Sequence, residues 1–265
     1  MANNALAVLE SALRARKLDR TLTTALPPLD RTDPSSLLAT GLSPLDACLR
    51  GGLPRGQLSE IAGPRSSGRF TLLMHLMAAA ARRGEIAAFV DTFDRFDVAS
   101  AMAAGIDLDR LLWIRGAAIT RPSMNGSELL TRTLDRAIKA LNLVLQAGGF
   151  GLVAIDLADV PGPTLRRLPF TTWLRIQRVV EGRDTACVLV TPEPLSRSAG
   201  GLTLMLDSQT VWTGSPERPR VAGADVRLRV VSPRRRVGGE VAMPAAAAEL
   251  LGHPVAAGQP VAAGL

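Results

Sequence analysis

The chain has 265 residues, which is enough for one α/β core with appendages, and its 47% hydrophobic and 21% charged residues are ordinary for a soluble globular protein. No apolar run reaches the length of a membrane-spanning helix, and residues 1–20 lack the apolar region and cleavage site of a secretion signal, so we expect a cytoplasmic protein without a membrane. The formal net charge of +7 favours an acidic partner such as nucleic acid, but only weakly, because nearly all of the excess is arginine, as a GC-rich genome encodes by default.

The first part of the chain predicts an appended helix and a linker. Residues 1–20 place apolar side chains close to helical spacing, which indicates a short amphipathic helix, and Leu6, Leu9 and Leu13 are its candidate protein contacts. Residues 21–36 are rich in Pro and Thr and are typical of a linker. We place the core at 37–240 and expect the Ala-, Pro- and Gly-rich residues 241–265 to be largely disordered.

Within the core, apolar strand-like segments alternate with helical ones. The predicted strands are 58–63, 86–91, 111–116, 150–157 and 186–191. The predicted helices are 70–83, 96–105, 126–147 and 171–182. This alternation predicts an α/β fold with a mainly parallel sheet and helices on both faces. Two strand-like segments after residue 200 follow without helices, and we expect them to extend the sheet in antiparallel fashion.

The segment GPRSSGRF, at 63–70, has the spacing of a phosphate loop, G-x-x-x-x-G-K-[ST], between a predicted strand and a predicted helix. Gly63, Ser66, Ser67 and Gly68 preserve the small residues that let backbone N–H groups converge on a phosphate at a helix N-terminus. On these eight residues alone, a chance turn between a strand and a helix is the alternative.

Two chemical roles of a working phosphate loop are changed. The lysine position holds Arg69, which keeps the charge but is bulkier and planar. The Ser/Thr position that would bind Mg²⁺ holds Phe70, which has no oxygen to offer. Neither Cys48 nor Cys187 has a neighbouring Cys or His at ligand spacing, so we predict no metal site.

Several further motifs occur in a fixed order around this loop. They are the T-G-x-x-x-L-D opening at 40–46, GGLPRG at 51–56, EIAGPRSSG at 60–68, AFVD at 88–91 and GIDLDRLL at 105–112. Together they resemble the bacterial RecA recombinase, and we expect the similarity to run from about residue 38 to about residue 240. The resemblance implies a RecA-like P-loop core.

Departures from the RecA pattern carry the functional argument. By the resemblance, the catalytic glutamate falls at Phe93 and the adenine-stacking tyrosine at Ser100, while Asp97 matches an aspartate near the base. Asp156 ends a strand as a Walker B aspartate should, but the segment 190–194 lacks the family's sensor glutamine. We therefore expect no ATP hydrolysis, no catalytic residue and no required cofactor, while binding of ATP or ADP stays open.

Arginines mark the candidate DNA or partner contacts. Arg166 and Arg167 lie where the first DNA loop of RecA would be, and the second loop is nearly absent, so strand exchange is not expected. Arg227 and Arg229 alternate with apolar residues, which predicts a strand with one basic face. The next basic group is Arg234, Arg235 and Arg236. These arginines would contact DNA phosphates or an acidic protein surface, or form a solvated strand face.

The short core, the altered phosphate loop and the truncated second DNA loop resemble the ImuA family of SOS mutagenesis accessory proteins. The resemblance implies a non-catalytic adaptor in error-prone translesion synthesis, with the Y-family homologue ImuB, RecA and a DnaE-type polymerase as partners, and with DNA contact open. The competing hypothesis is a DNA-dependent ATPase or recombinase of the RecA type with an atypical phosphate loop. A third, a cell-division inhibitor, has no support in the sequence.

Overall fold

The computed structural model describes residues 34–118, 128–195, 201–215, 217–231 and 239–243. The chain divides into two units between Asp33 and Pro34, and all described residues belong to the second unit. The predicted N-terminal contacts Leu6, Leu9 and Leu13 and the arginines at 234–236 lie outside the described residues.

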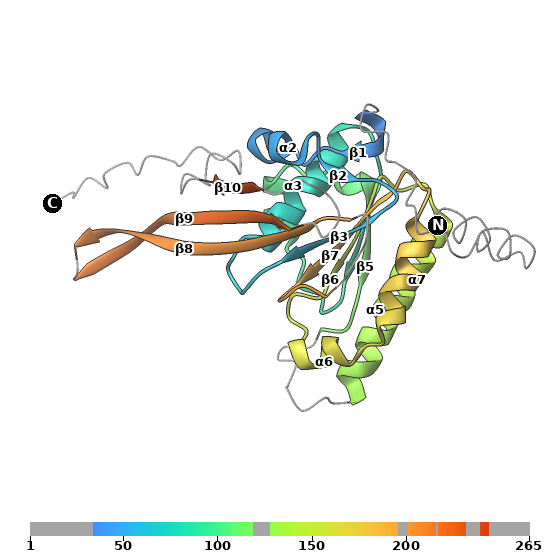
Figure 1. Cartoon of the computed structure of the whole chain (residues 1–265). Coiled ribbons are helices and arrows are strands. Elements are labelled where there is room, and N and C mark those ends of the chain that lie inside the picture. Colours follow the sequence, from blue (N-terminus) through green and yellow to red (C-terminus); the bar gives the residue numbers. More distant parts are fainter. Residues whose placement is uncertain (1–33, 119–127, 196–200, 216, 232–238, 244–265) are drawn as a thin grey trace, which may run out of the picture. The chain divides into compact units, whose positions relative to one another are not determined.

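One eight-stranded sheet organises the described unit, with the strand order β10-β9-β8-β3-β7-β6-β4-β5 (Figure 1). The strands are β3 (Leu58–Ala62), β4 (Ala87–Asp91), β5 (Leu111–Arg115), β6 (Leu152–Asp156), β7 (Ala186–Thr191), β8 (Thr203–Ser215), β9 (Arg218–Val231) and β10 (Gly239–Met243). The pairs from β8 to β5 are parallel, and β9 and β10 are antiparallel. A second, two-stranded sheet pairs β1 (Leu37–Leu38) with β2 (Leu53–Pro54).

Helices cover both faces of the large sheet, as predicted (Figure 1). One face carries α2 (Ser43–Leu49), α3 (Arg69–Arg82) and α4 (Val98–Ala103), and the other carries α5 (Glu128–Ala147), α6 (Gly162–Arg167) and α7 (Phe170–Val180). Two 3-10 turns, Pro34–Ser36 and Leu108–Arg110, complete the elements. Alternation along β4 divides the core, because Phe89 packs with the first group of helices and Val90 with the second. The predicted α/β fold is confirmed.

The C-terminal strands differ in part from the prediction. β9 and β10 are antiparallel as expected, but β8 runs parallel to β3, with Glu60–Ala62 opposite Thr203–Met205. The chain returns from the end of β7 to the middle of β3, where the Leu202 carbonyl accepts from the Glu60 N–H, so β8 starts in the same direction as β3. β8 and β9 then continue as a long hairpin (Figure 1), and β10 includes residues 241–243 of the segment predicted to be disordered.

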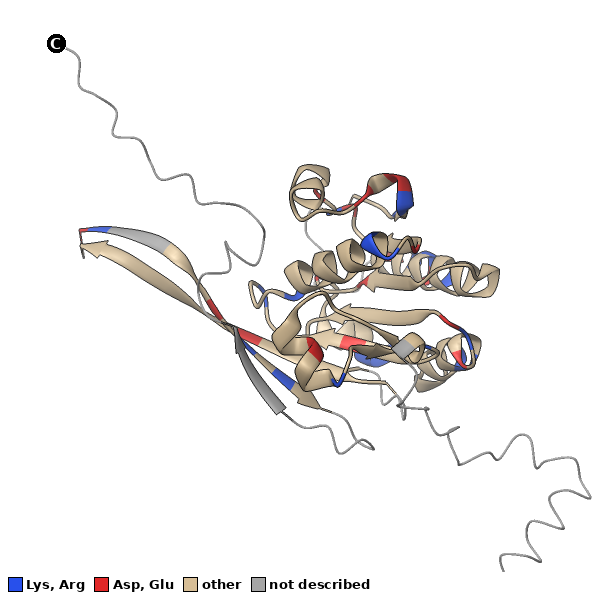
Figure 2. Cartoon of the chain, turned by 90° about the horizontal axis from the view of Figure 1, so that it is seen from above, with Lys and Arg blue, Asp and Glu red and all other residues tan. Residues whose placement is uncertain are grey.

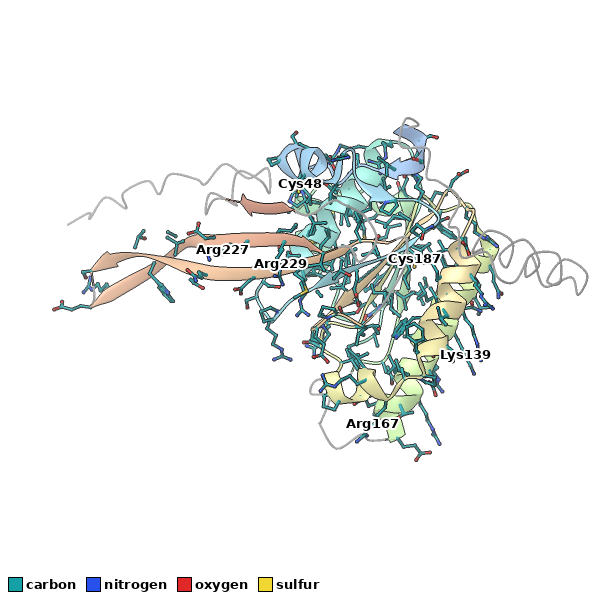
Figure 3. The ribbon with its side chains drawn as sticks, in the orientation of Figure 1. Cys48, Lys139, Arg167, Cys187, Arg227 and Arg229 are labelled. Carbon is teal, nitrogen blue, oxygen red and sulfur yellow. The ribbon has the colours of Figure 1, made fainter. Side chains whose placement is uncertain are left out.

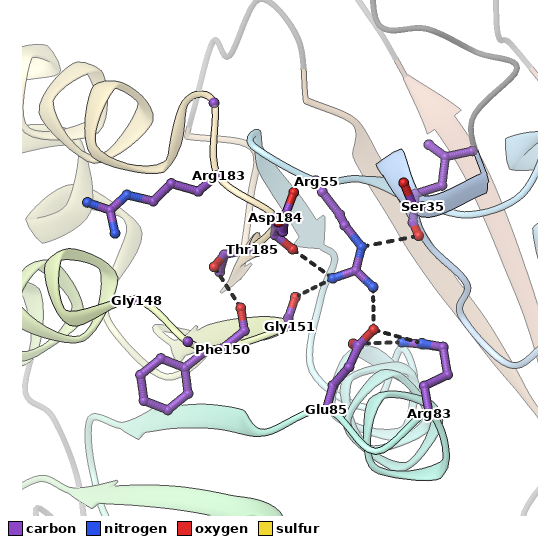
Figure 4. A pocket seen from close by; sticks show the side chains of 13 residues that line it. Ser35, Arg55, Arg83, Glu85, Gly148, Phe150, Gly151, Arg183, Asp184 and Thr185 are labelled. Atoms are coloured by element: carbon purple, nitrogen blue, oxygen red, sulfur yellow. Dashed lines mark hydrogen bonds and ion pairs between the residues drawn. The ribbon is translucent and has the colours of Figure 1, made fainter.

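Arg55 joins the amino ends of the strands at a pocket of about 890 Å³ (Figure 4). Its guanidinium donates to the carbonyls of Leu37, Gly151 and Asp184, and it also pairs with Glu85 at 2.5 Å. Four chain segments that are distant in sequence are thereby held by one largely buried cation. This pocket lies at the opposite ends of the strands from the phosphate loop, which follows β3.

Charged side chains of both signs are spread over the helices and along the β8–β9 hairpin (Figure 2). Cys48 and Cys187 are free and lie apart from one another (Figure 3). Complete burial raises the pKa of the Cys187 thiol to about 12, so this side chain stays a neutral core residue. In the part of the chain that the structure describes, no helix is long and apolar enough to cross a membrane.

Candidate functional site

The predicted phosphate loop connects β3 to α3 at the carboxyl edge of the sheet. Gly63 leaves the strand with no room for a side chain, since a Cβ there would lie 2.2 Å from the Leu206 carbonyl oxygen. Ser66 has a φ of 60° and Gly68 a φ of 88°, so the loop uses the left-handed region that small residues tolerate best. The Ser208 hydroxyl of β8 donates to the Ser66 carbonyl at 2.6 Å. The predicted Gly/Ser loop is therefore a defined backbone turn, braced from β8.

Arg69, the first residue of α3, is buried and forms a hydrogen bond inside the protein. Only 7% of the residue is exposed, and its Nη1 donates to the Thr191 carbonyl at the end of β7 over 2.6 Å. Burial lowers the pKa of Arg69, and the charges of Asp156 and Asp159 oppose this shift. The Gly63 N–H donates to the same carbonyl at 3.3 Å. The cation that the sequence places at the lysine position therefore ties the loop to β7.

Phe70 belongs to an aromatic row. Its ring centroid lies 6.1 Å from that of Phe89 and 6.3 Å from that of Phe96, and Phe96 in turn lies 5.2 Å from Trp113. These distances are in the range of favourable aromatic pairs. The position at which a working loop offers a magnesium-binding hydroxyl thus holds a partly buried ring that packs against the apolar core.

Ser67 is a buried polar residue of the loop. It is 1% exposed, and its hydroxyl has no hydrogen-bond partner among the described residues. A buried hydroxyl without a partner costs about 1–3 kcal/mol. Its Oγ lies 2.8 Å from where a Cβ of Gly63 would stand, so it is enclosed by the loop itself. The Ser67 hydroxyl is therefore enclosed within the loop and has no partner among the described residues.

Asp156 and Asp91 end adjacent parallel strands in direct register. The Asp156 carboxylate accepts from the Ala158 N–H at 2.8 Å, and burial raises the pKa of Asp156 to about 6, with Asp91 and Asp159 adding to the shift and Arg69 opposing it. Asp156 lies opposite Val190 of β7, and the next residue, Thr191, accepts from Arg69, so the predicted Asp156 and Arg69 lie in one site.

Asp91, which we had not singled out as a site residue, is fully buried. It accepts from the N–H groups of Arg95 and Phe96 at 2.8 Å and from the Trp113 indole at 3.2 Å. Its signal in the sequence was a buried strand that ends in an aspartate, the same pattern as Asp156. Its three donors give it the role of holding the turn after β4.

Phe93, at the position where the resemblance places a catalytic glutamate, is 4% exposed and packs in the core under α5 and α7. Phe70 packs on the opposite face of the sheet. The neighbouring Asp94 forms a two-pronged ion pair with Arg115, each contact 2.8 Å long, and this hydrogen bonding holds the pKa of Asp94 below its usual value. The position of the catalytic glutamate is therefore apolar, and the carboxylate next to it, that of Asp94, is paired with Arg115.

Asp97 caps the N-terminus of α4. Its carboxylate accepts from the Ser100 N–H at 2.8 Å, and hydrogen bonds from Ser100 lower the pKa of Asp97. The residue that the resemblance places near a base thus has a structural role in its own helix.

The predicted contact arginines lie in different surroundings. Arg166 forms an ion pair with Glu193, which joins α6 to the segment after β7, while Arg167 is exposed in the last turn of α6 (Figure 3). Arg227 and Arg229 are exposed on β9, where they lie opposite Asp207 and Met205 of β8 (Figure 3).

The alternation predicted for β9 is confirmed in its burial. Leu228 is 0% exposed and Val230 is 4% exposed, whereas the arginines between and beside them face outward. Val226 lies on the apolar side, 3.6 Å from where a Cβ of Gly68 would stand. The strand therefore covers the phosphate loop with one side and presents basic residues on the other.

Comparison with known proteins supports part of the resemblance. Residues 28–153 match the family described as the RecA N-terminal domain. The proteins named RecA from Clavibacter michiganensis subsp. michiganensis and Mycobacteroides abscessus are 37% and 36% identical over 128 and 124 residues, which is 48% and 46% of this chain. RecA of Desulfotalea psychrophila is 33% identical over 121 residues.

These matches cover only 30–32% of the relatives' own length, so the chain spans about a third of the RecA proteins that it matches. The family match at residues 28–153 includes the phosphate loop and ends in β6, so the similarity expected as far as residue 240 stays a prediction beyond that point. The loop, the parallel sheet and the matched region agree with one another. Residues 28–153 are therefore similar to the RecA N-terminal domain, and they lie in an α/β fold of the RecA type.

Proposed function

We propose that this protein is a non-hydrolysing, RecA-like accessory protein of the SOS response. It acts as an adaptor beside ImuB, RecA and a DnaE-type polymerase in error-prone translesion synthesis, in the manner of the ImuA family that its sequence resembles. Its working part is then a set of binding surfaces on a RecA-type scaffold, and the chain carries no catalytic residue.

The observation that carries the proposal is that the key side chains of the phosphate loop contact other residues of the same chain. Arg69 donates to the Thr191 carbonyl at 2.6 Å, and Phe70 packs against Phe89 and Phe96. Phosphoryl transfer depends on positioned cations, a metal ion and an oriented water. In this chain the cation, Arg69, already donates to a backbone carbonyl. The position of the metal-binding hydroxyl holds the phenyl ring of Phe70, and the position of the glutamate holds the buried Phe93.

Nucleotide is not required in this proposal, although a phosphate group could still occupy the cradle. The backbone turn at Ser66 and Gly68 supports anion binding at the start of α3. Binding of ATP or ADP without turnover would be consistent with an adaptor, because it needs no general base.

The test combines an activity assay with a partner assay on the full chain. We expect no magnesium-dependent phosphate release above the level of an Arg69→Ala control, with or without single-stranded DNA. We also expect co-purification with ImuB and RecA from the same organism. Turnover that disappears on Asp156→Asn would establish the ATPase alternative, and failure of both partners to bind would refute the adaptor.

A further inference from the structure

The outward face of α7 joins two apolar side chains to two cations. Phe170 is 48% exposed and Leu174 is 41% exposed, although both are large hydrophobic residues. Arg175 and Arg178 are exposed on the same helix, whose opposite side buries Trp173, Ile176 and Val180 against the core. The exposed apolar pair therefore is not part of the packing of α7 onto the sheet.

Helical geometry places these four residues on one face. Positions 170, 174 and 178 are four residues apart and follow one another along the helix, and position 175 lies beside them. We call this surface, made by Phe170, Leu174, Arg175 and Arg178, the α7 face. It begins with a phenyl ring, continues through Leu174 and ends in two guanidinium groups.

Neither cation of the α7 face forms an ion pair among the residues that the structure describes, whereas Arg166, just before this helix, is paired with Glu193. The one acidic residue at the end of this helix is Glu181, the C-cap. Two unpaired guanidinium groups next to an exposed apolar ridge favour an occupant that supplies both carboxylates and apolar contact.

We propose that the α7 face is a docking surface for an acidic, amphipathic helical segment of a partner protein. Apolar residues of that segment, spaced by three and four, would pack along Phe170 and Leu174, and its carboxylates would pair with Arg175 and Arg178. Single-stranded nucleic acid fits less well, because Leu174 offers no ring for base stacking and stands between the phenyl ring and Arg178. That the α7 face has a partner protein rests on the proposed adaptor function. The binding chemistry of the face can be tested without that partner.

The test measures fluorescence anisotropy of a labelled model helix on the full-length protein. In the probe, leucines recur every three to four positions and glutamates flank them, and a second peptide has lysine in place of every glutamate. We expect the acidic peptide to bind and the basic one not to bind. Arg175→Glu/Arg178→Glu and Leu174→Ser should each weaken binding by about tenfold or more.

Matched controls lie on the neighbouring helix α5. Arg132→Glu/Arg136→Glu reverses the same number of exposed arginines, and Leu143→Ser removes a leucine that is 65% exposed. Both controls should bind the acidic peptide like the natural protein. Absence of peptide binding, equal losses in the controls, or a labelled oligothymidine that binds in place of the peptide and is lost on Arg175→Glu/Arg178→Glu would overturn the proposal.

The adaptor function is read separately, by co-purification with ImuB and RecA. If the natural protein binds the acidic peptide through the α7 face but retains neither partner, the adaptor fails and the docking surface stands. If the partners are retained equally by the α7 variants and the peptide is not bound, the docking surface fails and the adaptor stands.

Discussion

Replacing Arg69 by methionine tests whether this side chain stabilises the folded protein in the absence of a ligand. Methionine fills much of the same volume but removes the 2.6 Å hydrogen bond to the Thr191 carbonyl. A hydrogen bond that involves a charged group contributes about 1.5–3 kcal/mol, so we expect the free energy of unfolding to fall by about 2 kcal/mol without any nucleotide present. For a domain of this size that corresponds to a melting temperature lower by about 4–8 °C.

The assay is urea unfolding followed by circular dichroism, with thermal unfolding beside it. Arg65→Met is the matched control, because its side chain is 80% exposed and its ion pair with Asp159 lies at the surface. We expect this control to change the free energy of unfolding by less than about 1 kcal/mol. Equal stability of Arg69→Met and the natural protein, or an equal loss in Arg65→Met, would refute the argument that Arg69 is an internal brace.

Three further predictions concern other residues. Burial raises the pKa of Asp156 to about 6, above the unfolded value of about 3.9, so ionisation of this carboxyl destabilises the fold as the pH rises through that interval. Asp156→Asn should therefore stabilise the protein by roughly 2–3 kcal/mol at about pH 7.5 and very little at about pH 4, and thermal scans that give the same gain at both values would contradict this. Arg55→Met should cost about 3 kcal/mol in urea unfolding, because three backbone carbonyls and Glu85 lose their common donor, whereas the exposed Lys139→Met should be neutral. Phe93→Ala should cost about 3–5 kcal/mol because it empties a buried core position, and a small loss in denaturant unfolding would mean that Phe93 does not pack as described.

Much of the fold could be predicted from the sequence because strong patterns are local. The strand at 186–191 has the predicted bounds, and the alternation of β9 gives the observed burial. The helix predicted at 96–105 is shorter, Val98–Ala103, because Asp97 caps its start. The helices α2 and α6, of seven and six residues, were missed because so few residues show little periodicity.

The chemistry of the phosphate loop was predictable, but its internal partners were not. The absence of an oxygen at Phe70 can be read directly from the residue type. That Arg69 would donate to Thr191 depends on β7 lying next to β3, a neighbour relation between segments more than a hundred residues apart. The parallel start of β8 likewise depends on where Leu202 meets Ser59 and Glu60, a contact that no local pattern contains.

The shared carbonyl of Thr191 has a consequence for how the protein responds to its surroundings. A protein gains stability from a ligand in proportion to how tightly the folded state binds it, so many nucleotide-binding proteins are more stable when nucleotide is abundant. Here Arg69 and Gly63 supply two donors to that carbonyl from within the chain. A loop tied in this way is held by the chain itself, so its form does not depend on a bound ligand.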